Sequence, residues 1–396
     1  KSNNLIDTNK QYIYVDSISD KLIKESEKGF TNLNWIKNHI NKSMDKSYSI
    51  LVKANKKNLN ISGLNKNNIF IYNHLYSLRK KKYILKLTLF FIKEFILSII
   101  DYFFYGGYRS FLLTELLKCY IYKLNFKNNI IKFAFFDTSN WIYRPLWTYY
   151  AENLDTQIIF YFYSTNIYQQ TMVKNHNFSD IILYGWECNT WTNFYVWNQY
   201  QAKFIKKVSK NPKISIVGPI LYQNDNLKIN SMKLNSYRND KKHTIISLFD
   251  IGFVRNSIHQ CQGLSLDYET HAIGIKFVKD VISICQEFDF LILYKSKRNF
   301  SRTKIFNPIF ESFIRNIDYK NFVILNPETS ASEVIKSSNG CISLPFTSTS
   351  VLAEHYGVKS CFYDPTNKLY SNAIQTSNIQ LIKGNYQLRK WLKSLI

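Results

Sequence analysis

The chain has 396 residues, of which 45% are hydrophobic and 16% aromatic, and it carries a formal net charge of +24 at pH 7. This length suits two domains with separate hydrophobic cores, and the apolar content excludes a generally disordered chain. The positive charge is compatible with nucleic acid, an anionic membrane surface or a phosphorylated substrate as partner. A Lys-rich composition, with the lysines solvated on the surface, explains the same net charge without any partner.

Residues 1–125 are predicted to be mainly helical. A basic cluster at 79–93 holds six Lys or Arg and no acidic residue, and it leads into an aromatic-rich stretch that ends at Tyr105. A core helix with a solvated basic end is the first interpretation of this segment. The second is an interfacial segment that binds anionic lipids. Charged residues interrupt the stretch, so no membrane-spanning helix is predicted.

Residues 126–225 change to an α/β pattern. Short apolar runs at 130–136, 157–163, 181–184 and 213–217 each end in polar or Gly-bearing residues, which is typical of buried parallel strands. A helix is expected over 197–208. We take residues 1–225 as an N-terminal domain, helical over 1–125 and α/β over 126–225.

A polar segment at 226–242 is predicted to be a linker. Beyond it, strand-like runs at 243–249, 288–294, 322–325, 340–344 and 360–363 alternate with helix-like stretches. Alternation on this spacing predicts an open parallel sheet in a second domain, 243–385, followed by a C-terminal helix at 386–396. The fold class is therefore α/β with two Rossmann-like domains in tandem, which is the GT-B arrangement.

The sharpest motif lies where the 340–344 strand ends. Pro345-Phe346 is followed by four hydroxyl residues and then by a helix. Unpaired N–H groups at a helix start, together with hydroxyls, bind anions such as a nucleotide phosphate. An ordinary N-cap would need one hydroxyl only. We assign phosphate binding to Thr347, Ser348, Thr349 and Ser350, and a sugar or ribose contact to Glu354.

A second motif, at the end of the 288–294 strand, contains Lys295, Lys297 and Arg298. These cations could neutralise a phosphate or a leaving nucleotide. A solvated basic loop is the alternative.

Carboxylates at strand ends are the candidates for a general base. Asp137 and Asp250 each follow an apolar run, and Glu187 lies in a Gly-Trp-Glu loop. Each could deprotonate an acceptor hydroxyl, and each Asp could equally cap the following helix. No metal site is predicted, because the sequence contains neither a DxD pair at a strand end nor cysteine and histidine at zinc-ligand spacing.

The stretch from Ser343 to Pro365 resembles the bacterial polysaccharide biosynthesis PFTS-motif proteins. Leu291 to Arg298 is similar to that family's Lys-Pro-Lys-Arg strand end, with Ser296 in place of Pro, and Phe249-Asp250 is similar to its Phe-Asp segment. The resemblance implies a GT-B glycosyltransferase of surface polysaccharide assembly. The chain also resembles, more distantly, the transferases of CMP-activated sialic acid and Kdo. Their His-Pro element has no counterpart in this sequence.

The resemblance implies a glycosyltransferase of capsule or O-antigen biosynthesis, and the lack of metal ligands in the sequence predicts transfer without a metal and with no cofactor beyond the donor. Its donor would be a nucleotide sugar, with CMP-activated nonulosonic acid or Kdo suggested by the resemblance, and its acceptor a glycan or lipid-linked hydroxyl. The alternatives are a non-catalytic polyanion-binding protein and a nucleotide-sugar epimerase. We expect a cytoplasmic protein, with peripheral contact to an anionic membrane left open and no nucleic acid partner.

Overall fold

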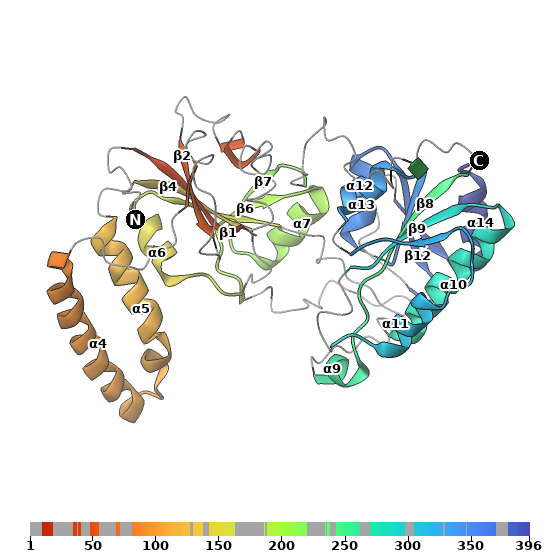
Figure 1. The fold of residues 1–396 in the computed structure, drawn as a ribbon. Coiled ribbons are helices and arrows are strands. Elements are labelled where there is room, and N and C mark those ends of the chain that lie inside the picture. Colours follow the sequence, from red (N-terminus) through yellow and green to blue (C-terminus); the bar gives the residue numbers. More distant parts are fainter. Residues whose placement is uncertain are drawn as a thin grey trace. The chain divides into compact units, whose positions relative to one another are not determined.

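The computed structural model describes residues 10–18, 35–37, 39–40, 48–54, 69–71, 81–126, 130–137, 142–162, 186, 188–219, 234, 236–237, 243–261, 270–297, 305–327, 329–345, 347–369 and 379–396. Two compact units emerge, the first within Lys1–Tyr163 and Ile182–Asn224, the second including Asp225–Ile396. Each unit is built on a parallel sheet (Figure 1). Two Rossmann-like domains, which are the domains of the GT-B fold, are therefore confirmed.

The sheet of the first unit has the strand order β3-β2-β1-β4-β5-β6-β7, and all its neighbouring strands run parallel. Its strands are β1 (Tyr12–Ile18), β2 (Ser49–Ala54), β3 (Ile69–Ile71), β4 (Ile131–Asp137), β5 (Gln157–Tyr161), β6 (Asn193–Val196) and β7 (Lys213–Ile216). The predicted strands at 130–136, 157–163 and 213–217 are confirmed, and β6 was not predicted.

The expectation that residues 1–125 are mainly helical is wrong for their first part. Strands β1, β2 and β3 lie there and extend the sheet beyond β4. Tyr12 to Val15 is a short run of aromatic and branched residues, all buried. Such a run fits a strand that is covered on both faces, but the polar Asn- and Lys-rich residues around it obscure the pattern in the sequence.

The sheet of the second unit has the order β10-β9-β8-β11-β12-β13, again all parallel. Its strands are β8 (Ile245–Phe249), β9 (Leu291–Lys295), β10 (Phe322–Ile324), β11 (Gly340–Ser343), β12 (Lys359–Asp364) and β13 (Gln380–Lys383). All five strands predicted for this domain are confirmed, and β13 is additional. The strand order is that of a dinucleotide-binding Rossmann sheet.

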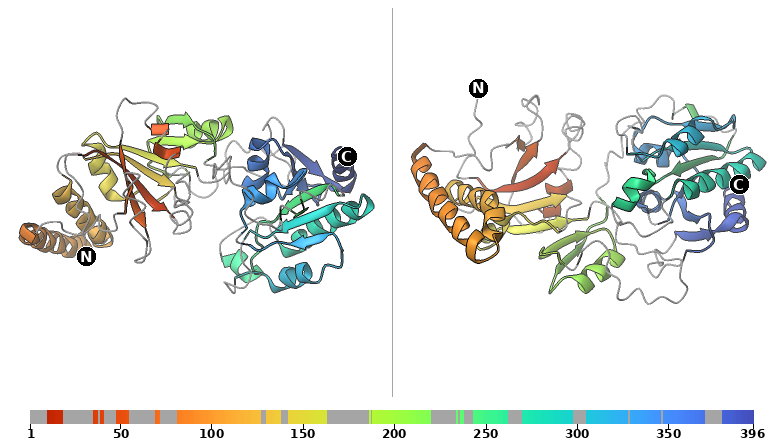
Figure 2. Two further views of the ribbon diagram at one scale, coloured as in Figure 1. Left: turned by 45° about the horizontal axis from the view of Figure 1, so that its top comes forward. Right: turned by 90° about the horizontal axis from the view of Figure 1, so that it is seen from below.

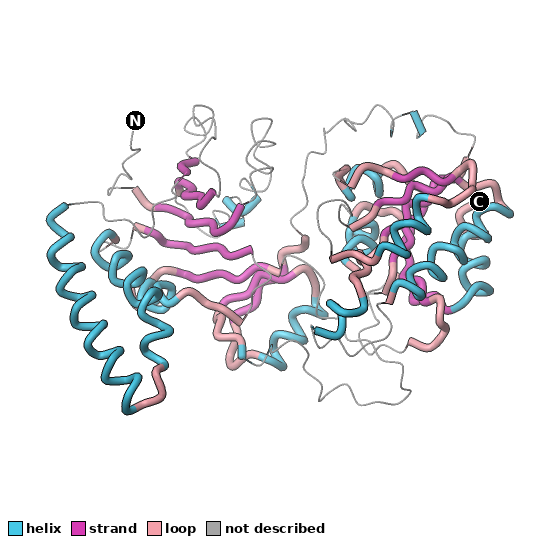
Figure 3. Tube along the Cα trace, turned by 60° about the horizontal axis from the view of Figure 1, so that its bottom comes forward, coloured by secondary structure: helices cyan, strands magenta, loops and turns pink. Residues whose placement is uncertain are grey.

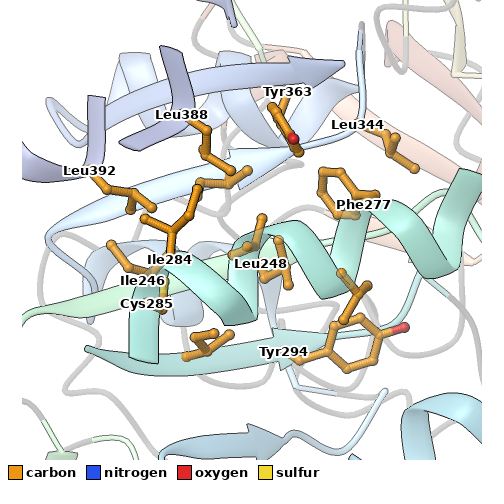
Figure 4. Close-up of a cluster of buried hydrophobic side chains, with 14 of the residues drawn as sticks. Ile246, Leu248, Phe277, Ile284, Cys285, Tyr294, Leu344, Tyr363, Leu388 and Leu392 are labelled. Atoms are coloured by element: carbon orange, nitrogen blue, oxygen red, sulfur yellow. The ribbon is translucent and has the colours of Figure 1, made fainter. Parts of the chain in front are cut away.

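Helices cover both faces of the second sheet, as the cyan coils of Figure 3 show. The labelled helices of this unit are α9 (Asn256–Cys261), α10 (His271–Glu287), α11 (Pro308–Arg315), α12 (Ala331–Lys336), α13 (Ser348–His355) and α14 (Gly384–Lys393). On one face, α10, α11 and α14 form the larger hydrophobic core with residues such as Ile246 and Leu248 (Figure 4). On the other face, α12 and α13 pack against Ile245 and Phe249. The C-terminal helix α14 therefore belongs to the second unit.

A helical hairpin extends from the first unit. It consists of η2 (Lys81–Tyr83), α4 (Ile84–Phe104) and α5 (Tyr108–Asn125), and α4 and α5 lie side by side in both views of Figure 2. The core-helix interpretation of this segment is wrong, because most large apolar side chains of α4 are exposed. Among the described residues, no helix combines the length and the apolarity needed to cross a membrane.

Helices α6 (Leu146–Glu152) and α7 (Gln199–Val208) also belong to the first unit. Asn198 caps α7 by accepting hydrogen bonds from the backbone N–H groups of Tyr200 and Gln201, and this helix was predicted at 197–208. The predicted strand at 181–184 lies outside the described residues. So does the predicted linker at 226–242, apart from Leu234, Ser236 and Tyr237.

Gly274 allows α10 to pack closely against the loop after β8. A Cβ added at Gly274 would lie 2.2 Å from a ring carbon of Phe253, and Phe253 is itself buried in the core. We expect Gly274→Ala to lower the free energy of unfolding of the second unit by about 1–3 kcal/mol through overpacking, measured by urea denaturation. In a Phe253→Leu background the same substitution should cost much less. An equal cost in both backgrounds would contradict the contact.

Candidate functional site

The two motifs of the second domain converge at one edge of its sheet. In the register of the strands, Phe249 at the end of β8 pairs with Lys295 of β9 on one side and with Ser343 of β11 on the other. The Lys295 loop and the Pro345 loop are therefore two strands apart, about 10 Å. Strand order reverses between β8 and β11, and ligands of open α/β sheets bind at such a reversal.

Asp250 lies between the two motifs and is buried. Its Oδ1 accepts a hydrogen bond of 2.8 Å from the backbone N–H of Lys297, and its Oδ2 accepts one from the Tyr294 hydroxyl. Burial raises the pKa of the Asp250 carboxyl, while these hydrogen bonds and the N–H of Gly252 favour its charged form. One oxygen thus binds β9 and the other the loop after it, which suits a positioning role better than proton transfer.

The cations predicted after β9 do not share one environment. Lys295 is buried, and its Nζ donates to the carbonyl of Ser296 at 3.3 Å. Lys297 is exposed, and its backbone is held by Asp250. Arg298 lies outside the described residues. Lys297 is therefore the described cation of this loop that can meet a ligand from solvent.

The first turn of α13 supplies N–H donors. Thr347 is the N-cap residue, and its side chain makes no capping hydrogen bond. The hydroxyl of Thr347 instead contacts that of Thr349 at 3.2 Å, and Thr347, Ser348 and Thr349 are all partly exposed. Uncapped N–H groups and the positive end of the helix dipole favour an anion at this position.

Ser350, the fourth hydroxyl residue of the motif, has another environment. It is fully buried, its hydroxyl lies 2.7 Å from that of Ser343, and it donates to the carbonyl of Cys361 at 3.0 Å. These contacts tie α13 to β11 and β12. Its hydroxyl is thus used inside the fold, whereas Glu354, one turn further along, is partly exposed.

In the first unit, Asp137 is the last residue of β4, beside the point where the strand order reverses between β1 and β4. Its side chain is exposed at one side, and no hydrogen bond joins it to the other described residues. The protein around it desolvates the carboxyl and raises its pKa to about 6. A carboxylate with this pKa can accept a proton near neutral pH.

Sequence reasoning missed Asp16 and Tyr294. Asp16 pairs in register with Phe136, so it lies at the same sheet edge as Asp137, and it accepts a hydrogen bond of 2.8 Å from the Tyr14 hydroxyl. The signal was present, because Tyr12 to Asp16 repeats the pattern of an apolar run ending in Asp. Glu187, the third predicted carboxylate, lies outside the described residues.

The described residues contain no group of three His, Cys, Asp or Glu side chains placed to hold a metal ion. The chemical groups that the structure does bring together in the second unit are N–H donors, hydroxyls and a lysine. This combination can bind a phosphorylated ligand.

A protein family described as "Polysaccharide biosynthesis PFTS motif protein" matches residues 92–392 of the chain. That range includes Asp137, Asp250 and both motifs of the second unit. No curated protein matches the chain.

Solved structures with a similar chain trace are distant. The Methanocaldococcus jannaschii UDP-GlcNAc 2-epimerase in complex with UDP-GlcNAc and UDP is 10% identical, with 98% of this chain and 92% of that chain covered and a TM-score of 0.47. The wall teichoic acid polymerase TagF is 14% identical, with 98% and 80% covered and a TM-score of 0.44. Acinetobacter baumannii MurG is 9% identical, with 98% and 90% covered and a TM-score of 0.41. Likenesses this weak do not distinguish one activity from another.

Substitution of Ser350 should affect stability, whereas substitution of Ser348 should affect ligand binding. Ser350→Ala removes a hydroxyl from a buried network and is expected to lower the free energy of unfolding by about 1–3 kcal/mol. Ser348→Ala changes a partly exposed side chain, so its effect should stay within about 0.5 kcal/mol, while binding of a phosphorylated ligand weakens. Urea denaturation and ligand titration of both variants test this. Similar losses of stability in the two would contradict the assignment.

Proposed function

Because the chain belongs to the polysaccharide biosynthesis PFTS motif family, we propose that it is a glycosyltransferase that moves a sugar from a nucleotide sugar to an acceptor hydroxyl. The observation that carries this proposal is the convergence of the uncapped start of α13 and the Lys297 loop at the strand reversal of the second unit. This arrangement suits the phosphate of a nucleotide donor.

In the proposed reaction, the acceptor oxygen forms a bond to the anomeric carbon while the bond from that carbon to the donor phosphate oxygen breaks. The leaving nucleotide keeps the electron pair and gains negative charge. Lys297 and the N–H groups at the start of α13 stabilise that charge as it develops. The acceptor's proton passes to Asp137, whose pKa is raised to about 6. Asp250 acts as a positioning residue, since it fixes the backbone of Lys297.

The finer parts of the proposal concern substrates and location. A CMP-activated nonulosonic acid or Kdo as donor, a glycan or lipid-linked acceptor, and a role in capsule or O-antigen synthesis come from the family resemblance. Transfer without a metal is included, because a lysine and helix N–H groups can carry the charge on the leaving phosphate. A cytoplasmic enzyme in peripheral contact with an anionic membrane would meet a lipid-linked acceptor where it is presented.

The raised pKa of Asp137 predicts a pH dependence. Below about pH 6 the carboxyl is protonated and cannot accept the acceptor's proton, so kcat/KM should fall about tenfold per pH unit. Asp137→Asn should lower kcat by about 100-fold or more and abolish this acidic limb. Transfer rates measured from pH 4.5 to 8, with melting curves to show that the variant folds, test this. An unchanged acidic limb in Asp137→Asn would exclude Asp137 as the base.

The donor site predicts selective nucleotide binding. A thermal-shift panel of CMP, UDP, GDP and their sugars should show stabilisation by one base, since a ligand that binds only the folded state raises the melting temperature. Lys297→Ala should reduce that shift, whereas Lys279→Ala, on α10 away from this edge, should not.

Product analysis then separates the candidate activities. Transfer to an acceptor supports the proposal. Conversion of the nucleotide sugar without any acceptor would indicate an epimerase. Equal stabilisation by every polyanion, lost steeply with salt, would indicate a non-catalytic polyanion-binding protein.

A further inference from the structure

In the half of the α4–α5 hairpin nearer its tip, carboxylates point inward and large apolar side chains point outward. Glu94 of α4 is 4% exposed, and its Oε2 accepts two hydrogen bonds from Arg109 of α5, at 3.0 Å and 2.7 Å. At the tip, the carboxylate of Asp101 accepts the backbone N–H of Arg109 at 2.7 Å and so caps α5. A hairpin in water shows the reverse distribution.

The outward side chains near the tip are large and apolar. Phe103, Phe104 and Phe111 are 73%, 76% and 83% exposed. The serines among them donate their hydroxyls to backbone carbonyls, Ser98 to Glu94 and Ser110 to Gly107. The charged groups and serines of the tip are therefore satisfied within the hairpin, which is what a hydrocarbon environment requires.

Apolar exposure extends around most of α4. Phe91 and Ile100 lie about 180° apart on a helix with 3.6 residues per turn, and both are exposed. A helix from another protein would cover only one side of α4, whereas lipid can surround the helix. This geometry favours a bilayer over a second copy of this chain.

The charges divide the hairpin into two levels. Between residues 94 and 112, the charged residues Glu94, Asp101 and Arg109 are buried or partly exposed, while Lys81, Lys82, Lys86 and Lys93 are all exposed nearer the base. On α5, the next charged residue after Arg109 is Glu115, about 10 Å from the start of the helix at 1.5 Å per residue. A tip inserted to that level stays within one leaflet's share, about 15 Å, of the hydrocarbon core. The lysines would then meet anionic headgroups.

The middle of α5 contacts the segment that follows Asp137. Glu115 of α5 accepts hydrogen bonds from the hydroxyl of Tyr143 and the backbone N–H of Leu146 at the start of α6. Burial raises the pKa of Glu115, but these bonds and that of Lys118 outweigh it and lower the pKa. Insertion of the tip would thereby fix the edge of the first sheet that carries Asp137 relative to the membrane surface.

We propose that the α4–α5 hairpin inserts its tip into one leaflet of an anionic bilayer and anchors the protein without crossing it. The purpose, access to a lipid-linked acceptor, rests on the proposed function, but the insertion itself does not depend on activity. Because Glu94 and Arg109 are paired, the free-energy cost of placing their two charges in the membrane is lowered.

Flotation of the full chain with vesicles of phosphatidylethanolamine and phosphatidylglycerol tests insertion. The double variant Phe103→Asp/Phe111→Asp should lower partitioning by at least about tenfold, because each charge placed in hydrocarbon is worth more than that factor. The matched control is Tyr386→Asp/Ile309→Asp, which alters exposed apolar residues of the second unit and should float like the wild type. Circular dichroism melting checks that both variants fold.

A fluorescence measurement separates insertion from surface adhesion. An environment-sensitive dye on Phe104→Cys, in a Cys188→Ser background, should shift to the blue with vesicles, whereas the same dye on the exposed Cys188 should not. Absence of vesicle binding, equal binding of the tip variant, or an unshifted dye on a bound protein would overturn the proposal. So would a wild-type dimer that the tip variant converts to monomer without any vesicle binding. Failure of sugar transfer alone would leave it standing.

Discussion

The reversal of strand order in each sheet is the constraint on which the rest of the structure depends. After β8 the chain adds β9 and β10 on one side and then returns to place β11 on the other side of β8. The chain after β8 and the chain after β11 run to opposite faces of the sheet. The carboxyl ends of these two strands therefore stay open to ligands. The first sheet repeats this arrangement around β1 and β4. The candidate residues lie at or just after the ends of strands at or beside a reversal, and they are Asp137, Asp250, Lys297 and Thr347.

Within the second unit, one buried carboxylate organises this edge. Asp250 fixes the backbone of Lys297 and binds the hydroxyl of Tyr294, so the lysine loop does not depend on a ligand for its position. On the other side, Ser350 fastens α13 to the sheet from below, which leaves the N–H groups of its first turn available. Positive groups held in place before a ligand arrives stabilise developing charge without reorganisation.

The sequence predicted the second domain almost completely, because its strands are apolar runs separated by amphipathic helices. Register was not predictable, and only register shows that Asp250 lies between the two motifs. The different roles of Ser348 and Ser350 were not predictable either, because they follow from the packing of α13 on β12. In the first domain, β1 to β3 were missed among polar residues. The core-helix interpretation of the hairpin was wrong, because apolar periodicity does not say what covers the apolar side of a helix.

Hydrogen exchange of backbone amides with the bound nucleotide tests the central claim most directly. If an anion is held at the strand reversal of the second unit, saturating nucleotide should slow exchange in peptides that cover residues 344–351 and 295–298, by at least about tenfold. Peptides from β7 and from the α4–α5 hairpin should exchange at unchanged rates. Protection confined to other segments, with residues 344–351 unaffected by a nucleotide that binds, would contradict the account.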